Sequence, residues 1–127
     1  MPVAKQVTVT AANRPGALAR IGEALAASRI NITGLDASGP QRQIRLLVSN
    51  PAGARRVLAH AGFRSRLENV VVVSLGDRPG TLGRTARKLA KAGVNINYAY
   101  GTVARGGKRA AIVFGVGNPG RAARLAR

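Results

Sequence analysis

The first residues of the chain alternate between polar and apolar side chains, which predicts a β-strand near residues 6–11 with one apolar face. Apolar residues then recur at the three- and four-residue spacing of an α-helix with one buried stripe. Two further strands near 30–38 and 42–49, a second helix from Pro51 and a short strand near 63–67 complete this part of the pattern. The predicted buried stripe of the first helix consists of Leu18, Ile21, Gly22 and Leu25.

The same order of elements then occurs a second time. Asn13-Arg14-Pro15-Gly16-Ala17-Leu18 recurs 64 residues later as Asp77-Arg78-Pro79-Gly80-Thr81-Leu82, and Asn31-Ile32 recurs as Asn95-Ile96. In each copy the first helix is expected to end at a residue in the left-handed conformation. This residue is Arg29 in the first copy and Gly93 in the second. The second copy is predicted to have strands near 70–73, 94–104 and 109–116 and a last helix from Pro119. A longer hairpin loop is expected at Arg105-Gly106-Gly107-Lys108. The predicted buried stripe of its first helix consists of Leu82, Ala86, Leu89 and Ala90.

This order, βαββαβ followed by βαββα, predicts an α+β protein with two ferredoxin-like modules in tandem. Each module would be an antiparallel sheet with its helices on one face, at residues 1–67 and 68–127. The second module would lack its last strand, because the pattern stops in its second helix. A module of about 60 residues is marginal alone, because it buries only about 60 % of its unfolded surface. We therefore expect the modules to pack together and the protein to form a homodimer or a higher oligomer.

The composition argues against an enzyme. The 127 residues include no cysteine, one histidine and four acidic side chains, which excludes disulfides, zinc–thiolate sites and thiol nucleophiles and leaves few acid–base candidates. The acidic residues are scattered, without the spacing of a metal site. Because 46 % of the residues are apolar, a packed core is expected. We predict a folded protein with no catalytic residues, no cofactor and no metal.

The formal net charge of +17 favours partners that carry negative charge. An excess of Arg and Ala is also typical of some genomes, and then says little about function. Nucleic-acid binding is an alternative, but only Phe114 lies in a strand where an aromatic ring would stack on bases. No apolar run is long enough to span a membrane and the first residues do not resemble a signal peptide, so we expect a cytoplasmic protein without a membrane partner.

The two Arg-Pro-Gly turns carry the candidate chemistry. Proline suits the first position of a helix, and the residue before it, Arg14 or Arg78, would be extended as the N-cap. The first N–H groups of a helix are unpaired and carry partial positive charge, so they attract a carboxylate. Gly16 and Gly80 have no Cβ and would let a carboxylate approach the backbone closely.

Asn31 and Asn95 each have a side-chain amide that can donate to a carboxylate and accept from an ammonium group. An acidic or Asn residue, any residue and Pro-Gly at the first strand-to-helix turn, followed by Asn-Ile at the second strand, resembles the ACT domain family. ACT domains are small ferredoxin-like modules that regulate metabolic proteins by binding amino acids. The resemblance covers nearly the whole chain, twice, and is to tandem ACT proteins without an attached catalytic domain.

The resemblance implies a non-catalytic, allosteric regulatory protein that binds a free amino acid at the Pro-Gly turns and between paired modules. Asp77 would pair with the ligand's ammonium more strongly than Asn13, so the two sites are expected to differ, or only one to bind. Alternatively, these residues only cap helices. The alternative functions are nucleic-acid binding and a regulatory subunit that docks on a metabolic enzyme. The ligand-binding residues implied are Asn13, Arg14, Gly16, Ala17, Leu18, Asn31 and Ile32 in the first copy and Asp77, Arg78, Gly80, Thr81, Leu82, Asn95 and Ile96 in the second.

Overall fold

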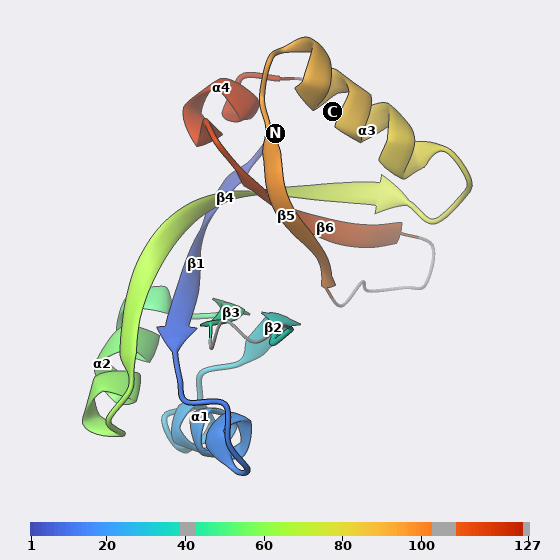
Figure 1. The fold of residues 1–127 in the computed structure, drawn as a ribbon. Helices are drawn as coiled ribbons and strands as arrows, with labels where there is room; N and C mark the ends of the chain where they lie inside the picture. Colours follow the sequence, from blue (N-terminus) through green and yellow to red (C-terminus); the bar gives the residue numbers. More distant parts are fainter. Residues whose placement is uncertain (39–42, 103–108, 126–127) are drawn as a thin grey trace. The chain divides into compact units, whose positions relative to one another are not determined.

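The computed structural model describes residues 1–38, 43–102 and 109–125, so the hairpin loop predicted at residues 105–108 lies outside the described residues. The chain divides into two compact units: the first unit, Lys5–Glu68, and the second unit, Met1–Ala4 with Asn69–Arg127. Figure 1 colours the elements along the sequence. In chain order they are β1 (Val3–Thr10), α1 (Ala17–Ala27), β2 (Ile32–Asp36), β3 (Gln43–Val48), α2 (Pro51–His60), β4 (Arg64–Gly76), α3 (Thr81–Lys91), β5 (Ile96–Thr102), β6 (Arg109–Val116) and α4 (Pro119–Ala123).

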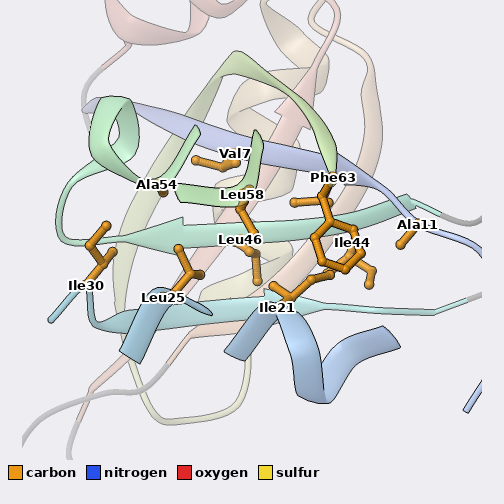
Figure 2. Close-up of a cluster of buried hydrophobic side chains, with 11 residues drawn as sticks. Val7, Ala11, Ile21, Leu25, Ile30, Ile44, Leu46, Ala54, Leu58 and Phe63 are labelled. Atoms are coloured by element: carbon orange, nitrogen blue, oxygen red, sulfur yellow. The ribbon is translucent and has the colours of Figure 1, made fainter. Parts of the chain in front are cut away.

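In the first unit β1, β3 and β2 pair antiparallel in that order, with α1 and α2 packed on one face. Val7 of β1 and Leu46 of β3 point toward the helices, where they meet Ile21 of α1 and Leu58 of α2 (Figure 2). All four side chains are fully buried. Because burying an aliphatic side chain stabilises by about 1.5–3 kcal/mol, this core holds both helices against the sheet.

The second unit repeats the arrangement with the strand order β4–β6–β5. Its core joins Val73 of β4 and Phe114 of β6 to Leu89 of α3 and Ala122 of α4. Each copy of the sequence pattern therefore forms a hydrophobic core of its own. The α+β class and the antiparallel pairing, both predicted from the order of elements, are confirmed.

The first residues of the chain belong to the second unit. The Val72 N–H in β4 donates to the Pro2 carbonyl (3.0 Å), and the Met1 amino group donates to the carbonyl of Ala123 (3.0 Å), the last residue of α4. Met1 is 7 % exposed and packs in the second core. The prediction that the second module lacks its last strand is therefore not confirmed, because the start of the chain supplies extended backbone beside β4.

Strand β4 is continuous over 13 residues, where the sequence predicted separate strands near 63–67 and 70–73. No Gly or Pro interrupts the chain from Arg64 to Leu75, so no local signal ends the strand between them. Its first residues, up to Glu68, belong to the first unit, and those from Asn69 onward belong to the second. One uninterrupted strand therefore contributes to both units.

The ends of the helices follow the local sequence signals in most places. Arg29 and Gly93, after α1 and α3, have φ of 57° and 74°, which confirms the predicted left-handed residues. Asn50 and Asn118, each before a proline, cap α2 and α4 with side-chain oxygens 3.0 Å from a backbone nitrogen of the first turn. The exceptions are the starts of α1 and α3, which form the candidate site.

Candidate functional site

The strand-to-helix turn has the same backbone hydrogen bonds in both units. In the first unit the Arg14 N–H donates to the Ala12 carbonyl (3.0 Å), and the Ala17 N–H donates to the Arg14 carbonyl (3.3 Å). The Arg20 N–H then donates to the Gly16 carbonyl (3.0 Å) as the helix begins. The equivalent three distances in the second unit are 2.9, 3.5 and 3.0 Å. The two turns therefore share one pattern of backbone hydrogen bonds.

The helices begin two residues later than the sequence predicted. The N-caps are Gly16, with φ of 87°, and Gly80, with φ of 94°, and no side chain caps either helix. The predicted N-cap roles of Arg14 and Arg78 are wrong, because the prolines lie in the turn and not at the first helical position. Left-handed φ at this point costs an ordinary residue about 1–2 kcal/mol, so the backbone itself favours glycine here.

The first turns of α1 and α3 keep N–H donors available for a ligand. Within the described residues, no hydrogen bond uses the backbone N–H of Leu18 or of Leu82. An anion at such a helix start gains about 0.3–1 kcal/mol when exposed. In the second turn the Thr81 hydroxyl donates to the Gly76 carbonyl (2.8 Å), so this side chain stabilises the turn.

A cavity lies beside each turn, of about 160 Å³ in the first unit and about 220 Å³ in the second. Both are lined by turn residues, by the first helical residues and by a neighbouring strand. The structure thus brings together most of the turn residues that the sequence singled out, although Gly16 does not line its cavity and Gly80 does. The lining residues are Ala11, Ala12, Asn13, Arg14, Ala17, Leu18, Ala37, Gln43 and Ile44 in the first unit and Leu75, Gly76, Asp77, Arg78, Gly80, Thr81, Leu82, Ala110 and Ile112 in the second.

The sequence missed the strand residues that complete the cavities. Gln43 pairs with Thr10 in the β1–β3 ladder, which brings it and Ile44 beside the first turn. Ala110 pairs with Leu75 in the β4–β6 ladder, beside the second turn. The signal that would have found them is the register between strands, which the hydrophobic pattern of a single strand does not provide.

Leu18 and Leu82 are exposed, at 43 % and 52 %, so their predicted place in the buried helical stripes is wrong. The first turn of each helix lies beside its cavity, and the stripe that packs on the strands starts one turn later. Each leucine therefore forms an apolar wall of its cavity. The residues that α1 and α3 do bury are Ile21 and Leu25 in α1 and Thr85 and Leu89 in α3.

The predicted Asn-Ile residues lie away from the cavities. The Asn31 N–H donates to the Ser49 hydroxyl (3.0 Å), and Ile32 and Ile96 pack against the two cores. Asn31 and Asn95 follow the far ends of α1 and α3, and a helix of 11 residues is about 16 Å long. That distance is too long for one amino acid to reach both the turn and the Asn of the same unit. Ligand binding by these four residues stays a prediction.

The charged groups of the cavities are Arg14 in the first unit and Asp77 with Arg78 in the second. This set can bind a small zwitterion through charge and hydrogen bonds. Among the described residues, no three His, Asp or Glu side chains gather as a metal site requires. No described helix is long and apolar enough to cross a membrane.

Several solved structures are similar to this chain. The protein BT0572 of Bacteroides thetaiotaomicron, a name that states no function, is 30 % identical, with a TM-score of 0.85 over 94 % of this chain and 83 % of that one. The regulatory subunits of aspartate kinase from Thermus thermophilus and Thermus flavus share the fold, at 21 % and 20 % identity and TM-scores of 0.65 and 0.58. Each covers 90 % of this chain, which covers 87 % of theirs. No curated protein matches the chain.

The resemblance of the sequence to ACT domains is tested by comparison with models of protein families. The family model of the ACT domain pair matches residues 1–126, which include both turns and both cores. The resemblance to ACT domains is therefore confirmed, and with it a ligand-binding regulatory role as the general function. The chain belongs to the ACT domain pair family.

Proposed function

We propose that this chain is a non-catalytic regulatory protein that binds a free amino acid in the cavities at its two strand-to-helix turns. The observation that carries the proposal is the recurrence of one cavity in both units, at equivalent residues and beside the same hydrogen-bonded turn. A turn that only capped its helix would need no cavity beside it.

The lining residues suggest how an amino acid would bind. Its carboxylate would accept from the free N–H of Leu18 or Leu82 and pair with the nearby guanidinium, which is Arg14 in the first cavity and Arg78 in the second. Its side chain would lie against the exposed leucine of the same cavity. Both parts of an amino acid, charged and apolar, would thus have a partner.

The organisation of the chain forms part of the proposal. We propose two ferredoxin-like modules in a cytoplasmic homodimer or higher oligomer, with the order βαββαβ at residues 1–67 and βαββα at residues 68–127. The division of contacts at Glu68 and Asn69 and the separate hydrophobic cores support the two modules. Docking on a metabolic enzyme, and a ligand position between paired modules, stay predictions. Nucleic-acid binding is disfavoured, because Phe114 is 1 % exposed and cannot stack on a base.

Thermal unfolding in the presence of each amino acid tests the proposal. A ligand at 100 times its Kd stabilises the folded state by about 2.7 kcal/mol, which is a readily measured shift. We expect a shift with at least one amino acid at millimolar concentration. If none of them shifts the midpoint, the proposal is wrong. Nucleic-acid binding that persists at physiological salt would favour the alternative.

Paired variants locate the binding. Arg14→Gln together with Arg78→Gln is expected to reduce the shift, whereas Arg56→Gln, an exposed charge on α2 outside both cavities, should leave it unchanged. Substitutions of Gly16 or Gly80 would not serve, because their positive φ makes any side chain destabilising whether or not ligand binds. An equal loss in the Arg56 control would indicate that only the net charge matters.

A further inference from the structure

Equivalent arginines of the two units point in different directions. In the first unit the Arg20 Nη2 donates to the Ala61 carbonyl (2.8 Å), and its guanidinium lies 4.8 Å from the centre of the Phe63 ring. These contacts hold Arg20 at the turn after α2, away from its own cavity. In the second unit the described residues after α4 are Arg124 and Leu125, and neither provides an aromatic ring.

Arg84, the counterpart of Arg20, folds back on the turn that bounds the second cavity. A Cβ built at Gly80, which lines this cavity, would lie only 2.8 Å from the Arg84 Nη1, whereas a Cβ at Gly16 would meet nothing within 4 Å. Among the described residues, none accepts a hydrogen bond from the Arg84 guanidinium. Its donors are therefore available at the edge of the second cavity.

The two sites consequently differ in charge. The second has the carboxylate of Asp77 and the guanidinium of Arg78 in its lining, and the guanidinium of Arg84 lies next to it, beside Gly80. The first has the neutral amide of Asn13 in place of the carboxylate and only one guanidinium, that of Arg14. Residues 69–127 contain no acidic residue besides Asp77, so the second unit supplies no further carboxylate to neutralise this pair of arginines.

We propose that the second cavity binds an amino acid with a carboxylate in its side chain. Asp77 pairs with the ammonium group of the ligand, Arg78 and the backbone N–H of Leu82 with its α-carboxylate, and Arg84 with the second carboxylate. This inference rests on the proposed function, since it takes the turns to be amino-acid sites, and it adds the class of ligand and the residue that selects it. The first cavity does not share this selectivity, because Arg20 is held elsewhere.

Isothermal titration of the full chain with glutamate, aspartate, glutamine and asparagine tests the inference. The acids and their amides have nearly the same shape and differ in one charge. An exposed ion pair changes affinity by about fivefold or less, so we expect up to about fivefold tighter binding of the better acid over its amide. This preference should weaken at high salt.

The matched variants are Arg84→Gln and Arg20→Gln, which remove the same charge at equivalent positions. We expect Arg84→Gln to abolish the preference for the acid, whereas Arg20→Gln keeps the preference. Unfolding midpoints without ligand confirm that both variants fold. If the amides bind as tightly as the acids, or if both variants lose the preference equally, this inference is wrong and the proposed function stands. If none of the amino acids of the full panel binds, the proposed function itself fails.

Discussion

The two units build the same strand ladder with different side chains. At the register shift of each hairpin, Gly34 of β2 pairs with Leu47 of β3, and the equivalent pair in the second unit is Tyr98 of β5 with Gly115 of β6. The glycine and the large residue have exchanged strands. This difference teaches that either strand can supply the member of the pair that has no side chain.

A second pair of equivalent positions differs in polarity. Asp36 and Arg45 face each other across β2 and β3 and form an ion pair at 3.1 Å. Tyr100 and Val113 occupy the same register in β5 and β6, and Tyr100 stacks on Tyr98 with ring centres 6.5 Å apart. The same register therefore accommodates an ion pair in the first unit and a Tyr–Val pair in the second. Each difference suggests substitutions that test why the two units have different residues at equivalent positions.

The largest effect is expected for Gly115→Leu, which gives β6 the residue that β3 has at the equivalent position. A Cβ at Gly115 would overlap the Tyr98 ring, so the ring has to leave its place or the strands have to separate. Overpacking of this kind costs about 1–3 kcal/mol, and we expect the upper end because β6 is the central strand of its sheet. Urea unfolding measures the loss of stability.

The compensating variant sharpens this comparison. Tyr98→Gly added to Gly115→Leu reproduces the arrangement of Gly34 and Leu47, and we expect it to recover part of the lost stability. The double-mutant cycle isolates the coupling of the two positions, with an expected interaction of about 1–2 kcal/mol. If the stability costs of Gly115→Leu and Tyr98→Gly are strictly additive, the two side chains do not compete for the same volume.

The Asp36–Arg45 pair should give the first unit a dependence on pH that Tyr100 and Val113 cannot give the second. Burial raises the pKa of Asp36. The hydrogen bonds from Ser38 and the hydrogen bond and charge of Arg45 lower this pKa by more than burial raises it, so the net pKa lies below its usual value. A carboxyl with a lowered pKa stabilises the fold above its unfolded pKa, near 4, and this stabilisation disappears as the pH falls through the folded pKa.

We therefore expect Asp36→Asn to lose about 1 kcal/mol of unfolding free energy at pH 7 and close to nothing at pH 2. Chemical denaturation at the two pH values measures the difference. The control is Glu23→Gln, an exposed carboxyl on α1, which should change stability little at either pH. A loss from Asp36→Asn that is equally large at pH 2 would contradict the role of the ionised carboxylate.

The features that the sequence predicted correctly depend on local signals. The order of elements followed from apolar periodicity, and the left-handed residues after α1 and α3 followed from where the helical pattern stops. The position of both turns followed from Pro-Gly, because few residues tolerate the backbone that this pair permits. These signals act over a few residues, so one sequence is enough to find them.

The features that the sequence missed depend on pairing between distant segments. Gln43 reaches the first cavity only through its pairing with Thr10, and Met1 is buried only because the start of the chain lies beside β4. Leu18 continues a helical stripe in the sequence, yet it is 43 % exposed and lies beside the first cavity. The periodicity of a helix predicts the direction in which a side chain points. Only the tertiary structure shows which residues that side chain contacts.

The smallest effects are expected for Leu18→Gln and Leu82→Gln, the two equivalent leucines at the cavities. Exposed positions without special contacts change stability by about 0.5 kcal/mol or less, so each variant should unfold close to the unsubstituted protein. The matched control is Leu25→Ala in the core of the first unit, for which a cost of about 2–5 kcal/mol is expected. Thermal and urea unfolding compare the three variants.

The same measurement, repeated over a range of protein concentrations, reports on the proposed homodimer. If one of the leucines is covered by a second copy, its substitution costs more at high concentration than at low, because association contributes to stability only where the copies are paired. A cost of about 2 kcal/mol that does not depend on concentration would instead mean that the leucine is buried within its own chain. A small, concentration-independent effect for both leaves the two leucines facing solvent, free to contact the side chain of an amino acid.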